Sequence, residues 1–129
     1  MPVGGSGPDR HLPHPAVIEA YGKGGFRFAG LSHRGSLLCL PDGIWAWPVA
    51  STADITAEAL APVLERAADL AFFILGAGSD PWPLPPALRQ HFRDAHLTAD
   101  AMTTGAAVRT YNVMLAEDRR VAAALIAVD

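Results

Sequence analysis

The chain has a single cysteine, Cys39, among its 129 residues. One cysteine cannot form a disulfide within the chain or a cysteine-based zinc site, and such sparing use is typical of proteins from a reducing compartment. Cys39 lies in the apolar run LLCL. We therefore expect it to be packed in the core as a small apolar side chain.

Basic residues and long apolar runs are also scarce. Ten Lys and Arg residues against 13 Asp and Glu residues give a net charge of -3, which does not fit a nucleic-acid-binding surface. The longest apolar run, LAFFILGA, is far shorter than the roughly 20 residues of a membrane-spanning helix. The first 15 residues also lack the apolar centre of a secretory signal. We expect a cytoplasmic protein with no membrane span and no nucleic-acid partner.

The composition is otherwise that of an ordinary globular domain, with 50% hydrophobic and 18% charged residues. Its length predicts one domain. Residues 1–15 are rich in Gly and Pro without periodicity, so we interpret them as a flexible leader before a single domain at 16–129. His11 and His14 in this leader are interpreted as incidental, and no metal or cofactor site is predicted.

The first half of the domain has the pattern of an antiparallel meander. The expected strands are AVIEAYG (16–22), FRFAGLS (26–32), GSLLCLP (35–41) and IWAWPV (44–49). Turn signals occur at 33–35 and 41–43. Trp45 and Trp47 are two residues apart and share one face of the last strand, as anchors of either the core or an interface.

The second half alternates strands and helices. Strands are expected at 69–76, 96–102 and 121–128, and helices at 56–67, 84–95 and within 103–120, where residues 117–120 form a charged turn before the last strand. Thr56 is a plausible N-cap, although Pro62 delays the regular helix to about Ala61. The continuous apolar strand DLAFFILG is typical of a strand buried on both faces of a parallel sheet. This β-α-β-α-β order predicts the α/β class.

Ligands of open parallel sheets bind beyond the carboxyl ends of the strands, where two segments of this chain are expected. These are Gly76–Asp80, which follows the buried strand, and Thr103–Gly105, which begins the last helix. The first lacks the third glycine and the direct helix entry of a dinucleotide-binding motif, and no phosphate-binding Gly-Lys-Ser/Thr follows. A serine here also lacks the Gly-x-Ser-x-Gly motif of hydrolases, so no catalytic residue is predicted.

The last helix carries two stripes. Ala107, Val108, Tyr111, Met114 and Leu115 are spaced to face the sheet, while Arg109 and Asn112 share a second, polar stripe. Arg109 is close enough to the helix N-terminus to help bind a small carboxylate or phosphate there. Alternatively, Arg109 pairs with Asp80 or Asp100, and Asn112 holds a neighbouring backbone. The candidate ligand-binding residues are Gly76, Gly78, Ser79, Thr103, Thr104, Arg109 and Asn112.

Several segments resemble a small domain family of unknown biochemical function that includes a mitochondrial complex I assembly factor. They are IEAYGKGGFRFAG, GSLLCLP, ILGAGSDPWPLPPALRQHF and ADAMTTGAAVRTYNVMLAEDRRVAAALI. The last resembles the family pattern Met-Asp-Thr-x-Ala-Ala-Cys-Arg-Thr-Tyr-Asn, followed by Glu-Gly-Arg-x-Val. It departs from that pattern at Thr103, Val108 and Asp118. Because Val108 replaces the cysteine, thiol chemistry is not expected at this helix.

The resemblance implies three layers, with a mixed central sheet, helices and an added hairpin. It also implies a non-enzymatic binding or assembly module linked to the biogenesis of respiratory complexes or membrane proteins. Such a module would contact a protein partner through Trp45 and Trp47 or through the crevice beyond the carboxyl ends of the parallel strands. The alternative is a small-anion-binding protein or enzyme with its site in that crevice, and a homo-oligomer fits either hypothesis.

Overall fold

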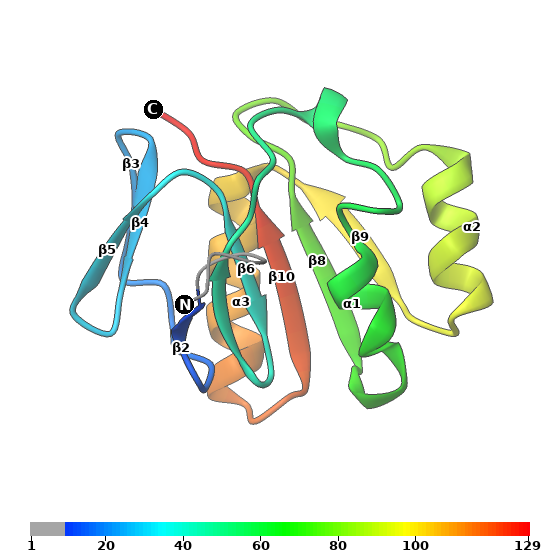
Figure 1. Cartoon of the computed structure of the whole chain (residues 1–129), viewed down its shortest axis with the longest axis horizontal. Helices are drawn as coiled ribbons and strands as arrows, with labels where there is room; N and C mark the ends of the chain where they lie inside the picture. Colours follow the sequence, from blue (N-terminus) through cyan, green and yellow to red (C-terminus); the bar gives the residue numbers. More distant parts are fainter. Residues whose placement is uncertain (1–9) are drawn as a thin grey trace, which may run out of the picture.

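A mixed six-stranded sheet forms the centre of the computed structural model, which describes residues 10–129 (Figure 1). The strands lie in the order β2 (Arg10–Leu12), β7 (Gly43–Ala46), β6 (Leu37–Leu40), β10 (Val121–Leu125), β8 (Phe72–Gly76) and β9 (Ala99–Met102). β8 is parallel to both β10 and β9. The pairs β10–β6, β6–β7 and β7–β2 are antiparallel. The predicted α/β class and mixed sheet are confirmed.

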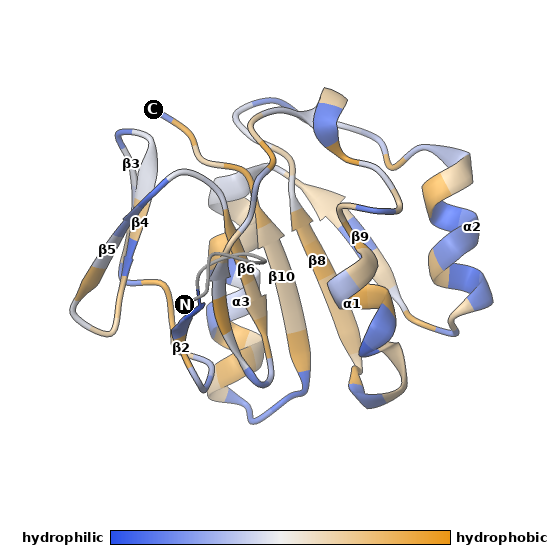
Figure 2. Cartoon of the chain, in the orientation of Figure 1, coloured by the Kyte–Doolittle hydropathy of each residue, from blue (hydrophilic) through white to orange (hydrophobic). Residues whose placement is uncertain are grey.

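The central strands are apolar on both faces because both faces are covered. In β8, Phe73 and Leu75 point into one hydrophobic core and Ile74 into the other. All five residues of β10 are buried, and its central residues are alanines. Figure 2 shows these strands as the apolar centre of the fold. A continuous apolar run is therefore a correct sign of a doubly covered strand.

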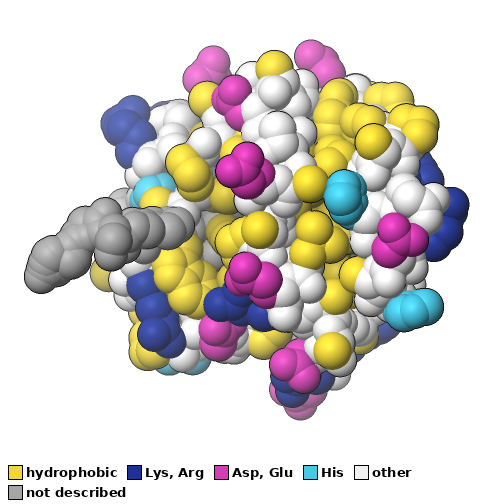
Figure 3. Space-filling view, turned by 45° about the vertical axis from the view of Figure 1, so that its right-hand side comes forward, with side chains coloured by type: hydrophobic (Ala, Val, Ile, Leu, Met, Phe, Trp, Pro, Cys, Tyr) yellow, Lys and Arg dark blue, Asp and Glu magenta, His cyan; other side chains and the backbone are white. Residues whose placement is uncertain are grey.

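Helices cover the two faces unequally. One face carries α1 (Ala61–Glu65), the 3-10 turns at Thr52–Asp54 and Ala67–Asp69, and α2 (Pro86–Asp94). The predicted stripe of Leu84, Leu88 and Phe92 is buried there. On the outside of this half of the molecule, acidic, basic and apolar side chains are interspersed (Figure 3). The other face carries the long helix α3 (Thr104–Ala116). These layers agree with the three-layer expectation.

A separate three-stranded sheet lies beside α3 and differs from the predicted meander. It consists of β3 (Ala20–Gly22), β4 (Gly25–Phe28) and β5 (Leu31–Arg34). The expected single strand at 26–32 is wrong because Ala29 and Gly30 both have positive φ and make a tight hairpin turn. His33 and Arg34, expected in a turn, therefore belong to β5, and Gly35 and Ser36 connect it to β6.

The expected leader also differs from the structure. Arg10–Leu12 form β2, which pairs with Trp45 and Ile44 of β7 and so covers an edge that would otherwise have unpaired backbone groups. Three residues are too few to show periodicity, which explains the error. The rest of the predicted flexible leader, residues 1–9, lies outside the described residues.

Helix starts are closer to the prediction. Regular helix begins at Ala61, as Pro62 suggested, and the Thr56 hydroxyl accepts a hydrogen bond from the Ala59 N–H at 3.1 Å in the preceding turn. Thr103 is the N-cap of α3, and its hydroxyl accepts from the Ala106 N–H at 3.4 Å. α3 ends at Ala116, in agreement with the charged turn expected at residues 117–120, and Asp118 turns the chain with a φ of 59°.

Candidate functional site

The loop after β8 and the start of α3 meet at the carboxyl ends of the parallel strands, as the sequence predicted. The Thr104 N–H donates to the Gly78 carbonyl at 2.9 Å, and the Gly78 N–H donates back to the Thr104 hydroxyl at 3.0 Å. The same hydroxyl donates to the Ile126 carbonyl at 2.7 Å. Thr104 therefore joins the ends of β8, α3 and β10.

This network occupies the polar groups of the crevice. Thr104 is fully buried, and its hydroxyl already makes one donated and one accepted bond. A Cβ atom added at Gly76 would lie 3.0 Å from Leu125 Cδ2 and 3.1 Å from the Thr104 Cα. The glycine is therefore needed for close packing of α3 on β8, which is a structural role.

Ser79 and Thr103 are the sequence neighbours of Gly78 and Thr104 in this network. Ser79 is exposed and, among residues 10–129, its side chain forms no hydrogen bond. Thr103 is half-buried, and its hydroxyl caps the helix. The predicted residues are thus brought together, but most of their polar groups bind one another.

Asn112 holds a neighbouring backbone, in agreement with one of the two alternatives. Its Oδ1 accepts from the Ile18 N–H at 2.8 Å, and its Nδ2 donates to the Ile18 carbonyl at 2.9 Å. The side chain therefore satisfies both backbone groups of Ile18, in the way that a neighbouring strand would. This bond pair fixes the chain just before β3 against α3.

Arg109 is exposed, and the alternative in which it pairs with Asp80 or Asp100 is wrong. Within the described residues its side chain forms no hydrogen bond or ion pair, with Asp80, Asp100 or any other residue. A Cβ atom added at Gly105 would lie 2.6 Å from the Tyr21 hydroxyl oxygen and 3.6 Å from Arg109 Nη1. Tyr21 and Arg109 therefore flank Gly105 on the outer side of α3.

The two tryptophans differ in exposure. Trp47 is 4% exposed and its Nε1 donates to the Ala59 carbonyl at 3.0 Å, so it is a core residue. Trp45 is half-buried and packs against the same core. The guanidinium carbons of Arg10 and Arg66 each lie 5.4 Å from the Trp45 ring centroid. Little of the expected tryptophan pair is left to contact a partner.

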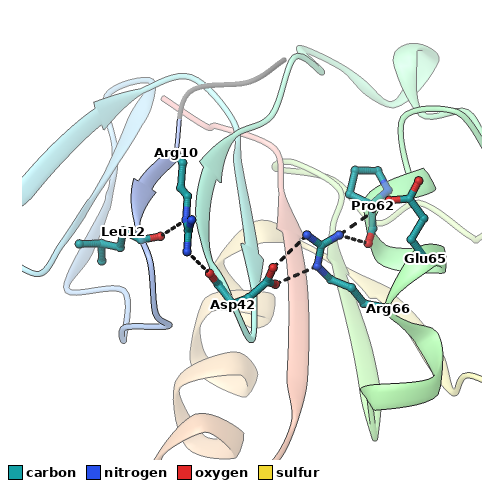
Figure 4. A network of polar contacts seen from close by, with 6 residues as sticks. All are labelled: Arg10, Leu12, Asp42, Pro62, Glu65 and Arg66. Atoms are coloured by element: carbon teal, nitrogen blue, oxygen red, sulfur yellow. Dashed lines mark hydrogen bonds and ion pairs between the residues drawn. The ribbon is translucent and has the colours of Figure 1, made fainter. Parts of the chain in front are cut away.

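A polar network surrounds the hairpin turn at Asp42 (Figure 4). Arg66 Nε and Nη2 donate to the two Asp42 carboxylate oxygens at 2.8 and 3.0 Å, while Arg10 Nη2 donates to the Asp42 backbone carbonyl at 2.8 Å. The hydrogen bond from Arg66 lowers the pKa of Asp42 below its usual value. This network links β2, the β6–β7 hairpin and the end of α1.

Two further polar groups are enclosed in the core beneath α3. Burial raises the pKa of the Cys39 thiol to about 12, so the cysteine is an inert core residue, as expected. The Tyr111 hydroxyl is buried without a hydrogen-bond partner among residues 10–129, and burial together with nearby Cys39 raises its pKa. Neither group is accessible to a ligand.

A hollow on the three-stranded sheet was not expected from the sequence. It has a volume of about 590 Å³, and Lys23, Arg27 and Arg34 are among its lining residues. One available signal was charge, because residues 20–41 contain no Asp or Glu.

The two histidines near the start of the described chain have different neighbours. His11 Nε2 lies 3.0 Å from His33 Nδ1, whereas His14 Nδ1 lies 3.0 Å from the Pro15 carbonyl. No cluster of three or more His, Cys, Asp or Glu side chains within residues 10–129 is arranged to hold a metal ion. None of the helices in that range has the length and apolar character needed to cross a membrane.

Relatives and solved structures match almost the whole domain. An uncharacterised protein of Rhodobacter capsulatus is 36% identical over 109 residues, which cover 84% of this chain and 82% of that protein. NADH dehydrogenase [ubiquinone] 1 alpha subcomplex assembly factor 3 of the mouse is 28% identical over 115 residues. That match covers 89% of this chain but 62% of the mouse protein, so the chain spans less than two thirds of that relative.

The crystal structure of an outer membrane protein from Bartonella henselae has a TM-score of 0.88 and 46% sequence identity, covering 92% of this chain and 100% of that one. The family of proteins of unknown function DUF498/DUF598 matches residues 18–126, which include the three-stranded sheet, the crevice network and α3. The chain is therefore a member of the DUF498/DUF598 family.

Proposed function

We propose that this chain is a non-enzymatic protein-binding module that assists the assembly of a respiratory membrane complex. The observation that carries the proposal is the extent of the similarity to the mouse assembly factor, which covers 89% of this chain. The similarity therefore extends over the domain as a whole, although the mouse protein is longer. A shared assembly role is the simplest function for two chains that are alike over a complete domain.

The crevice supports this proposal through its hydrogen bonds. The Thr104 hydroxyl binds Gly78 and Ile126, and Asn112 binds Ile18, so these groups stabilise the fold. A ligand in the crevice would have to displace those bonds, at a cost of about 1–3 kcal/mol for each buried group left unpaired.

The outer side of α3 offers a surface for a protein partner. Val113 is 57% exposed, and Val17 and Tyr21 are 45% and 42% exposed. Because Asn112 binds the backbone of Ile18, the adjacent residues Val113 and Val17 lie close to one another, and Tyr21 lies beside Gly105 of α3. We call Val17, Tyr21, Arg109 and Val113 the α3 surface. Tyrosine and arginine, both present on this surface, are enriched at the centres of protein interfaces.

The test is deletion of the gene in the native host. Blue native electrophoresis of the membranes should show less fully assembled complex I, and NADH:ubiquinone oxidoreductase activity should fall with it. A plasmid copy of the gene should restore both. Normal amounts of assembled complex I in the deletion strain would refute the proposal.

A second candidate function is binding of a small anion near the start of α3, for which the unpaired Arg109 is the supporting observation. Phosphate or sulfate at constant ionic strength should then raise the unfolding temperature of the wild type, and Arg109→Gln should abolish that increase. An equal increase in both proteins would contradict a site at Arg109.

A further inference from the structure

The outer face of the three-stranded sheet combines small residues with two arginines. Its register pairs Ala20 with Arg27 and Arg27 with Ser32, and it pairs Gly25 with Arg34. Because side chains alternate along a strand, these residues share one face, and Phe26 and Phe28 point into the core from the other. Arg27 and Arg34 therefore project from a face of small residues and line the hollow of about 590 Å³.

This face carries positive charge that no acidic side chain among residues 10–129 neutralises through an ion pair. The residues that line the hollow include Lys23, Arg27 and Arg34 but no Asp or Glu. Within the described residues, none of the three cations forms an ion pair or a side-chain hydrogen bond, and this holds even though Glu19 lies close to them in sequence. Three of the ten basic residues of an acidic protein thus lie together, with no ion pair to any residue in the described range.

The C-terminal residues run beside this hairpin. The Gly24 N–H donates to the Val128 carbonyl at 2.8 Å, and the Asp129 carbonyl oxygen would lie 3.9 Å from a Cβ atom added at Gly22. Arg34 Nη1 would lie 3.7 Å from a Cβ atom added at Gly24, so its guanidinium extends over the turn. Among residues 10–129, no ion pair joins Asp129 to these cations.

We propose that this face binds an extended acidic segment of a partner protein, with two carboxylates at alternate positions. Arg27 lies opposite Ser32, so Arg34 is its diagonal neighbour across the β4–β5 pair. Such neighbours are about 7–8 Å apart. Residues i and i+2 of an extended peptide are about 6.8 Å apart and point the same way. An acidic-x-acidic segment can therefore present one carboxylate to each guanidinium.

The available donors favour a peptide over a small phosphate compound. The backbone N–H groups of β4 lie in a strand paired on both sides, so few of them are free to surround a phosphate. The hollow instead offers separated side-chain donors, among them two guanidiniums, the Lys23 ammonium and the Ser32 hydroxyl. Guanidiniums bind carboxylates through paired hydrogen bonds. Separated donors suit a ligand whose charges are also separated.

This inference rests on the proposed function, since it names the chemistry of the partner segment. It is tested with purified protein, so its result is independent of the deletion strain. The probe is a fluorescein-labelled peptide, Gly-Thr-Glu-Val-Glu-Thr-Gly, and its matched control carries Gln in place of both Glu residues. Fluorescence anisotropy is measured for the full chain at low ionic strength and at about 0.15 M salt.

The wild type should bind the Glu peptide at least about tenfold more tightly than the Gln peptide, with weaker binding at higher salt. The double substitution Arg27→Gln and Arg34→Gln should remove that preference. The control double substitution, Arg93→Gln and Arg119→Gln, removes the same charge elsewhere on the surface and should retain the preference. Thermal unfolding of each variant checks that it is folded.

Three results would overturn the inference. One is equal binding of the Glu and Gln peptides by the wild type, which does not depend on any variant folding. Another is an equal loss of the preference for the Glu peptide in both double variants, which would show that binding depends only on the net charge of the protein. The third is tight binding of tripolyphosphate without binding of the Glu peptide, which would assign the face to a small anion.

Discussion

The Asn112 side chain binds both backbone groups of Ile18, at 2.8 and 2.9 Å, although the two residues are 94 positions apart in sequence. Ile18 is 3% exposed, so this bond pair fixes a buried residue and the start of the three-stranded sheet to α3. Asn is a poor residue for a helix interior, and this contact explains its presence there.

Asn112→Ala should lower the free energy of unfolding by about 1–3 kcal/mol, because two hydrogen bonds are lost and the Ile18 backbone is left unpaired. Urea unfolding followed by tryptophan fluorescence measures the change. Val113→Ala is the matched control, since Val113 is the exposed neighbour and should shift stability by less than about 0.5 kcal/mol. Equal effects of the two substitutions would contradict the role of Asn112.

Thr104→Val keeps the shape of the side chain but removes the hydroxyl that joins Gly78 to Ile126. The Gly78 N–H and the Ile126 carbonyl both lose this partner, so we expect a loss of about 2–4 kcal/mol in the same unfolding experiment. Thr110→Val is the control. The Thr110 hydroxyl donates to the Ala106 carbonyl within α3, a bond whose loss should cost less than about 1 kcal/mol.

Tyr111→Phe should leave stability unchanged or raise it by up to about 1 kcal/mol. The Tyr111 ring is fully buried, but its hydroxyl has no hydrogen-bond partner in the described part of the chain, so removing the oxygen removes an uncompensated buried polar group. Tyr111→Ala, which also removes the ring, should cost about 3–5 kcal/mol. A marked loss on Tyr111→Phe would indicate a bond to Cys39 or to a buried water molecule.

Asp42 should make the free energy of unfolding depend on pH in the acidic range. Its pKa is lower in the folded protein because Arg66 donates to the carboxylate, so its stabilising effect is present above the unfolded pKa of about 3.9. The effect is lost as the pH falls through the lower, folded pKa. Solvent screens this half-exposed pair, and Asp42→Asn should therefore cost less than about 1 kcal/mol at pH 7.

The substitution Asp42→Asn also tests the direction of this pH dependence. Stability curves of the wild type and Asp42→Asn, measured from about pH 7 to about pH 2, should converge as Asp42 becomes protonated. Curves that stay equally far apart at every pH would show that the ion pair with Arg66 is not the cause.

The covered strands and amphipathic helices were predictable from periodicity. Phe73, Ile74 and Leu75 form a continuous apolar run, and Leu84, Leu88 and Phe92 are spaced four apart. The continuous run indicates a strand buried on both faces, and the spacing of four indicates a helix buried along one stripe. These elements also determine the β-α-β-α-β order, and therefore the parallel half of the sheet.

The first half was harder to predict because its signals are short. Ala29-Gly30 makes a tight turn inside an apolar stretch, so the stretch resembles one strand. β2 is only three residues long and is held by pairing with β7, a contact that no local pattern indicates. Tertiary contacts decide both of these cases.

The candidate site was predictable in position but less so in chemistry. The convergence of Gly78 and Thr104 follows from the rule for parallel sheets. The sequence could not show that Thr104 would bind Ile126, which follows β10. Whether Asn112 holds a backbone or a ligand depends on Ile18, which is far away in sequence. For Arg109, the expected acidic partners are not in contact.

The assembly role is tested most directly by complementing the deletion strain with surface variants and measuring assembled complex I by blue native electrophoresis. Val17→Lys with Val113→Lys changes the α3 surface, and Leu31→Lys changes an exposed apolar residue on β5 as the control. We predict that the wild type and Leu31→Lys restore complex I, whereas the double variant, folded and equally abundant, does not. A deletion strain that assembles normal amounts of complex I without any copy of the gene would contradict the account.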